Sequence, residues 1–119
     1  VARENAKANK VKITFAKHDL LLGVKGKFDV IIANLPYVPM SDYIKRLDNL
    51  HFEPKLAITD GGDDFKLITE LIAQARSCLT TKGVLLLELD PKTPKHIKTC
   101  KPKIYKDIQG LSRSAEIKF

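Results

Sequence analysis

The pattern of apolar and polar residues along the chain predicts strands that alternate with helices. Residues 11–19 alternate apolar and polar side chains, as expected for a strand with one buried face. Short, almost entirely apolar runs at 28–34 and 84–89 predict strands that are buried on both faces. Residues 64–80 place apolar side chains at helical spacing and predict an amphipathic helix.

The remaining pattern completes an α/β arrangement. Helices are predicted at 1–9 and 94–100, and two last strands at 103–107 and 114–119. Residues 34–62 contain three prolines and show no period, so we expect a long loop that is functional or mobile. Strands interleaved with helices predict an α/β fold with a largely parallel sheet.

The composition indicates a folded protein and excludes several classes. The 119 residues suffice for one domain, and 44% of them are hydrophobic. No apolar run reaches the roughly 18 residues that a membrane span requires, and no signal peptide is visible. Cys78 and Cys100 show neither metal-ligand spacing nor a disulfide-rich pattern. We therefore expect no metal, no membrane and a cytoplasmic protein.

The charge leaves the class of partner open. A net charge of +7 tolerates an anionic partner without requiring one. The stretch Pro91–Lys106 contains six lysines and no acidic residue. It is interpreted either as a solvated helix face and loop or as a patch for RNA or an acidic protein surface.

The start of the chain resembles the body of a helix. Val1 opens an alanine-rich run without a residue that would cap a helix. We therefore expect the chain to begin inside a longer protein.

Candidate chemistry follows the predicted strand at 28–34. Asn34 ends this strand, and Pro36 turns the chain at once because the residue before a proline avoids the helical region. Ligands of open α/β sheets bind beyond the carboxyl ends of the strands, so this turn lies where a small molecule would bind. The Asn34 amide and the Leu35 carbonyl can accept hydrogen bonds, and the Tyr37 ring can stack on a planar group.

Asn34, Leu35, Pro36 and Tyr37 resemble the (Asn/Asp)-Pro-Pro-Tyr motif of amino-methyltransferases, with leucine in the second place. These class I enzymes use S-adenosylmethionine to methylate planar, poorly nucleophilic nitrogens. Two acceptors that hold both N–H hydrogens orient such a nitrogen and favour the charge that develops on it.

The flanking segments are similar to the release-factor glutamine methyltransferases, the HemK/PrmC family. That family continues with Glu-Pro-x-x-Ala-Leu, a Gly/Asp-rich turn, a helix, Gly-Gly-x-Leu-x-Leu-Glu and a closing Asp-x-x-Gly-x-x-Arg. The matching segments here are Phe52–Ile58, Asp60–Asp64, Lys82–Glu88 and Lys106–Arg113.

The resemblance implies an enzyme, a cofactor and a substrate. Residues 1–119 would be the C-terminal portion of one methyltransferase domain, with a partial Rossmann-like sheet that lacks the first two strands and ends in an antiparallel strand. The cofactor would be S-adenosylmethionine, and the substrate the glutamine of the Gly-Gly-Gln motif in peptide chain release factors. Asn34–Tyr37 would hold the glutamine, with Asn34 also near the cofactor. Asp19 and the Leu20 backbone would lie beside the adenine, or Asp19 is only a cap or turn residue.

Other polar residues are assigned structural roles. Glu53-Pro54 is interpreted as a loop anchor rather than as a functional turn beside the pocket. Glu88 is interpreted as a buried, hydrogen-bonded acid at a strand end rather than as a pocket wall, and Arg113 as a surface or pairing residue rather than as a substrate contact. The histidines are treated as bystanders: His18, His51 and His96.

Departures from the family pattern keep alternatives open. Asn-Leu-Pro-Tyr is also the form of ribosomal RNA adenine dimethyltransferases, so N6-adenine methylation of RNA or DNA is the second hypothesis, and a non-catalytic remnant is the third. No Asp/Glu-x-Gly-x-Gly loop occurs in the 119 residues. We therefore expect this chain alone to be inactive and to bind the cofactor weakly. We also expect the strands at 11–17 and 28–33 to expose apolar edges, so that the chain is marginally stable, rearranges or associates.

Overall fold

The computed structural model describes residues 1–45, 54–59, 62, 65–91 and 93–119. Along the chain these residues form α1 (Ala2–Ala8), β1 (Phe28–Ala33), α2 (Met40–Lys45), α4 (Lys55–Ile58), α5 (Lys66–Cys78) and β2 (Leu79–Glu88). Two 3-10 turns follow, η1 (Thr93–Lys95) and η2 (Lys98–Cys100), and then β3 (Lys103–Lys106) and β4 (Ser112–Lys118). Among these described residues, none of the helices has the length and hydropathy that a membrane span requires.

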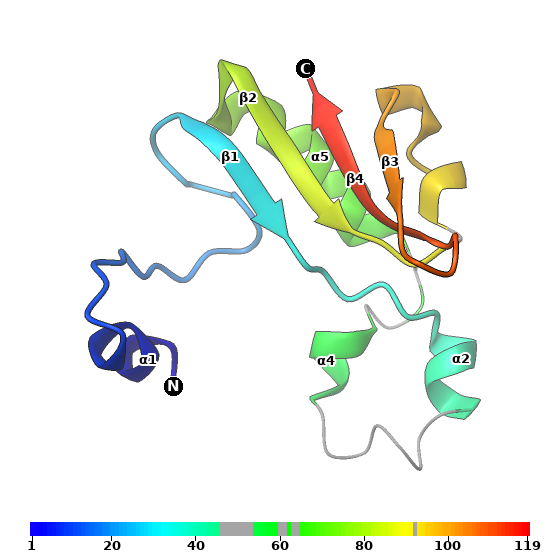
Figure 1. Cartoon of the computed structure of the whole chain (residues 1–119), viewed down its shortest axis with the longest axis horizontal. Helices are drawn as coiled ribbons and strands as arrows, with labels where there is room; N and C mark the ends of the chain where they lie inside the picture. Colours follow the sequence, from blue (N-terminus) through cyan, green and yellow to red (C-terminus); the bar gives the residue numbers. More distant parts are fainter. Residues whose placement is uncertain (46–53, 60–61, 63–64, 92) are drawn as a thin grey trace.

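The four strands form one mixed sheet in the order β1-β2-β4-β3 (Figure 1). β1 and β2 are parallel because α5 carries the chain back across the sheet between them. β3 and β4 are antiparallel because a tight turn at Gly110 joins them, and β4 also runs antiparallel to β2. The α/β class is confirmed. The expectation of a largely parallel sheet is wrong, since two of the three strand pairings are antiparallel.

The core lies between α5 and one face of the sheet (Figure 1). The buried side chains of α5 recur at helical spacing and include Ile68, Leu71 and Ala75. They pack on alternate residues of the central strands, of which Leu85 and Ile117 are almost completely buried. The helix predicted at 64–80 is therefore confirmed in position and in the face that it buries. The strand predicted at 84–89 is also formed, but it begins earlier, at Leu79, and it buries one face while the other is only partly covered, so the expected burial on both faces is wrong.

The strand predicted at 11–19 is not formed. Residues 11–18 have no regular secondary structure, and Val11 and Ile13 are about half exposed, at 51% and 54%. Alternation specifies which side chains a strand would bury, but a strand also needs a neighbour for its backbone groups. No described strand lies beside this segment, so its backbone N–H and C=O groups do not pair with a sheet.

Two further predictions need correction. The stretch 34–62 contains α2 and α4, so the part that the structure describes is not only a loop. The helix predicted at 94–100 is divided into η1 and η2. The helices α2 and α4 and the turns η1 and η2 are all short, and apolar periodicity cannot be detected over so few residues.

The prediction that the strand at 28–34 is buried on both faces is wrong, whereas the expected apolar edge at 28–33 is confirmed. β1 is an edge strand, and Phe28, Val30 and Ile32 are 41%, 49% and 77% exposed. Val30 and Ile32 point away from α5, beside Val84 and Leu86 of β2. Such an exposed apolar edge predicts that the chain is marginally stable or associates.

Candidate functional site

The segment Asn34–Tyr37 lies directly beyond the carboxyl end of β1. β1 ends at Ala33, and Pro36 cannot donate a backbone hydrogen bond that would continue the ladder. The chain is then held from the other side, because the Val38 N–H donates to the Ile58 carbonyl of α4 at 3.0 Å. The segment is thus fixed at both ends, and between them it runs past the carboxyl ends of the strands (Figure 1).

Two hydrogen-bond acceptors of this segment face no partner in the described part of the chain. The Asn34 side chain is exposed, and no hydrogen bond from a described residue ends on it or on the Leu35 carbonyl. The Leu35 side chain packs against the core, which fixes the backbone from which its carbonyl projects. Each acceptor is therefore available to a hydrogen-bond donor of a bound molecule.

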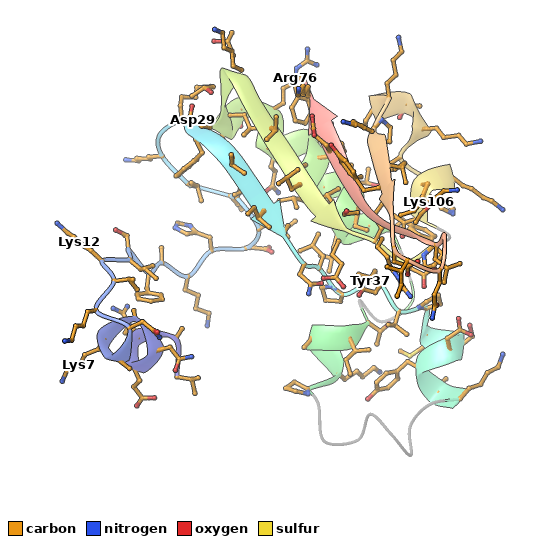
Figure 2. The ribbon with its side chains drawn as sticks, in the orientation of Figure 1. Lys7, Lys12, Asp29, Tyr37, Arg76 and Lys106 are labelled. Carbon is orange, nitrogen blue, oxygen red and sulfur yellow. The ribbon has the colours of Figure 1, made fainter. Side chains whose placement is uncertain are left out.

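Tyr37 is anchored to the neighbouring strand. Its hydroxyl donates to Glu88 Oε1 at 2.7 Å, and its ring packs against the core (Figure 2). The contact follows from the parallel pairing of β1 and β2, whose last partners are Ala33 and Leu87. Partial burial, then the hydrogen bond to Glu88 and the charge of Glu88, raise the pKa of Tyr37 to about 12. Tyr37 is therefore a neutral donor at physiological pH.

An ion pair at the β3–β4 turn borders the same strand ends. Arg113 Nε donates to Asp107 Oδ2 at 2.8 Å, and the other Asp107 oxygen accepts from the N–H groups of Gln109 and Leu111. These bonds, with the one from Arg113 first, lower the pKa of Asp107 below its usual value. The positive charge of Arg113 opposes the rise in the pKa of Tyr37, which places Arg113 within electrostatic reach of the Tyr37 hydroxyl.

The two residues predicted to contact adenine lie in a turn before β1. Asp19 is exposed, and its carbonyl accepts from the Leu22 N–H at 3.0 Å. Leu20 adopts a left-handed backbone (φ 51°) while its side chain packs against the same core as Leu35 and Tyr37. The Leu21 N–H donates to Gln74 Oε1 of α5 at 2.8 Å, which fixes the turn to the core helix.

The structural roles predicted from the sequence are partly confirmed. Arg113 is an ion-pairing residue, as expected. Glu88 ends its strand and is hydrogen-bonded, as expected, but it is exposed rather than buried, and Tyr37 was not predicted as its partner. The only signal for that bond in the sequence is that both residues follow apolar strands. Glu53 and His51 lie outside the described residues.

The other two histidines have contacts of their own. His96 stacks on Phe65 with ring centroids 3.5 Å apart, and His18 Nδ1 lies 3.1 Å from the Leu22 carbonyl. Within the described part of the chain, no three His, Cys, Asp or Glu side chains converge as metal ligands.

Comparison with curated proteins identifies similar methyltransferases. The release factor glutamine methyltransferase of Deinococcus radiodurans is 37% identical over 92 residues, which cover 77% of this chain and 33% of the relative. The ribosomal protein uL3 glutamine methyltransferase of Francisella tularensis is 36% identical over 92 residues, covering 75% of this chain and 29% of the relative. The chain thus spans about a third of the length of these relatives. No family model matches.

A solved structure shares the fold. It is the ribosomal protein L11 methylase of Lactobacillus delbrueckii subsp. bulgaricus, with a TM-score of 0.59 and 24% sequence identity. The match covers 99% of this chain and 51% of that protein. The arrangement of strands and helices described above therefore corresponds to part of a methyltransferase structure.

Proposed function

Since this chain is homologous over about three quarters of its length to release factor glutamine methyltransferases, we propose that it is the C-terminal portion of a protein glutamine N5-methyltransferase domain. The homology supports transfer of a methyl group to a protein glutamine. The finer proposal is that the substrate is a peptide chain release factor. The uL3 methyltransferase is also similar to this chain, so ribosomal protein uL3 is the alternative substrate.

The observation that carries the proposal is the pair of unengaged acceptors beyond β1. A glutamine side-chain amide has two N–H hydrogens in one plane, and its nitrogen lone pair is delocalised into the carbonyl. Donation of one hydrogen to Asn34 Oδ1 and of the other to the Leu35 carbonyl would fix the plane and direct the nitrogen toward a methyl donor. Both acceptors would also stabilise the positive charge that develops on nitrogen during attack.

Tyr37 would form one wall of the glutamine site. Its hydroxyl is committed to Glu88, so the ring is held and the flat amide can pack against it. No basic group is required before attack, because the proton can leave the nitrogen for solvent once the new N–C bond has formed. A neutral Tyr37 suits this role, since an ionised phenol beside the amide would draw its N–H hydrogens away from the two acceptors.

The residues of this chain fit one part of the cofactor. When bound, S-adenosylmethionine supplies the methyl group from its sulfonium. The exposed Asp19 carboxylate and the Leu20 N–H, which donates to no described residue, would receive the adenine, with the apolar Leu20 side chain beneath. The sequence holds no Asp/Glu-x-Gly-x-Gly loop for the methionine part. We accordingly propose that the 119 residues alone bind the cofactor weakly and are inactive. We also propose that the protein acts in the cytoplasm.

The test is methyl transfer by the complete protein that contains this chain. Purified release factor and purified uL3 are each supplied with methyl-labelled S-adenosylmethionine, and each is also tested with its target glutamine replaced. Activity on the release factor that vanishes with its glutamine is expected. Activity on uL3 alone would support glutamine methylation but refute the release factor as the substrate. Methylation of adenine in RNA instead would refute both proposals.

Asn34→Ala tests the acceptor role directly. Loss of one hydrogen bond to the reacting amide should lower kcat at least tenfold, because such a contact strengthens as charge develops. Asn9→Ala is the matched control, since Asn9 is also an exposed asparagine but lies at the end of α1. Equal rates for wild type and Asn34→Ala would show that Asn34 does not hold the amide.

A further inference from the structure

A second candidate site lies at the opposite end of the sheet from Tyr37. α5, η2 and the paired ends of β3 and β4 surround an open cavity of about 650 Å³. Arg76 borders it from α5, and Figure 2 shows Arg76 and Tyr37 at opposite ends of the strands. Ile72 and Ile117 contribute an apolar floor. The cavity is therefore separate from the proposed methyl-transfer site.

The rim of this cavity is strongly basic. Four cations line it: Arg76, Lys101, Lys103 and Lys118. The side-chain carboxylate among the lining residues is that of Glu116, which already accepts from Tyr105 at 2.7 Å and pairs with Lys118 at 3.1 Å. The remaining positive charge is not neutralised by the side chains around it, so the cavity attracts anions.

Further exposed lysines lie on η1, on β3 and in and just after η2, close in sequence to the cavity residues. Lys95, Lys98 and Lys101 follow one another at intervals of three residues through η1 and η2, and Lys106 ends β3. All are exposed, and none has an ion-pair partner among the described residues. Several cations in and beyond one cavity match a polyanion with several charged groups better than they match a single small anion.

The walls of the cavity favour a nucleic acid over an acidic protein. Phe119 lines the cavity and is 45% exposed, so its ring is available to a planar group. Ring stacking beside a positively charged groove is the usual way in which proteins bind single-stranded nucleic acid, because every base has an aromatic face. Carboxylate side chains of an acidic peptide would gain nothing from the aromatic and apolar walls.

We propose that the cavity between α5, η2 and the β3–β4 end binds single-stranded nucleic acid, with a base in the apolar cavity and phosphates on the surrounding cations. This site does not depend on methyl transfer at Asn34. It would hold the protein near an RNA or DNA strand while the other end of the sheet acts on its target.

Salt dependence of binding tests the phosphate contacts. Fluorescence anisotropy is measured with labelled oligouridylate and oligothymidylate of ten nucleotides, using the complete protein that contains this chain. Four phosphate contacts predict a slope of about −3 in a plot of log K against log salt, or about 50-fold weaker binding at 200 mM than at 50 mM salt. Tighter binding of one oligonucleotide identifies RNA or DNA as the ligand.

Matched variants separate this site from general charge. Lys101→Gln with Lys103→Gln should reduce the slope by about 1.4 and weaken binding. Lys7→Gln with Lys12→Gln removes the same charge from the N-terminal segment, far from Arg76 (Figure 2), and should leave the slope unchanged. Equal effects of the two pairs would overturn the proposal, since they would show attraction by net charge alone.

A cysteine in the cavity wall reports whether the cavity is filled. Cys100 lines the cavity and is partly exposed, whereas Cys78 is buried at 4% exposure. Bound oligonucleotide should slow alkylation of Cys100 by neutral N-ethylmaleimide, with Cys78 as the internal reference. Unchanged alkylation of Cys100 at saturating oligonucleotide would overturn occupancy of the cavity. Equal competition by polyglutamate would show an acidic-protein site instead.

Discussion

The contact between Tyr37 and Glu88 determines how the candidate site is shaped, and Glu88→Gln tests it. The substitution keeps an oxygen that can accept from the Tyr37 hydroxyl but removes the negative charge. Burial contributes most to the high pKa of Tyr37, and the hydrogen bond and charge of Glu88 contribute next. We therefore expect the pKa of Tyr37 to fall below about 12 in the variant but to stay above the ordinary tyrosine value of about 10.

The magnitude can be read as an ionised fraction. With a pKa of about 12, roughly a tenth of Tyr37 is ionised at pH 11 in the wild type. Any fall in the pKa raises this fraction, and a fall by about one unit raises it to roughly one half. Absorbance at 295 nm follows the ionisation, and the difference from a Tyr37→Phe variant isolates the Tyr37 signal.

The control is Glu70→Gln, which removes an exposed carboxylate of α5. It should leave the Tyr37 titration unchanged. The reasoning is refuted if Tyr37 titrates at the same pH in Glu88→Gln and in the wild type. A wild-type Tyr37 that ionises near pH 10 would refute it as well, because the ring would then be neither buried nor bonded to Glu88. The titration must be completed before the chain unfolds, which circular dichroism at each pH verifies.

Three further predictions concern the fold that carries the site. Gly83→Ala should lower the free energy of unfolding by about 1 kcal/mol in urea, because the added Cβ would lie 2.9 Å from the Phe28 carbonyl oxygen. This strain exceeds the conformational entropy that alanine regains relative to glycine. Unchanged stability would show that β1 shifts to make room for the Cβ. Leu85→Ala should cost about 2–5 kcal/mol in the same assay, because Leu85 is fully buried, whereas a cost below about 1 kcal/mol would indicate a loosely packed core. The lowered pKa of Asp107 predicts that its pairing with Arg113 stabilises the fold above about pH 4, and that this stabilisation is lost as the pH falls through and below that value. Asp107→Asn should flatten this acid limb of the stability curve, and an unaltered limb would exclude the pair as its cause.

Much of the fold and part of the candidate site follow from local sequence. The helix α5 was predicted because burial of one face leaves a periodic pattern in its side chains, and the strands β1 and β2 were predicted because they contain short apolar runs. The position of Asn34–Tyr37 beyond β1 was predicted because Pro36 ends the strand. The similarity to glutamine methyltransferases was also contained in these local segments, and the comparisons bear it out.

Other features depend on which segments meet in space. Residues 11–19 carry the alternation of a strand, yet whether they form one depends on a neighbouring strand, which no local pattern records. The bond between Tyr37 and Glu88 joins residues 51 positions apart and exists only because β1 and β2 pair in parallel register. The basic cavity likewise gathers Arg76, Lys101 and Lys118 from three separate elements. Sequence therefore determined α5, the apolar cores of β1 and β2 and the end of β1 at the candidate site. Tertiary structure decided which further segments become strands and how the strands pair, because hydrogen bonds between strands and the summing of charges require neighbours that are distant along the chain.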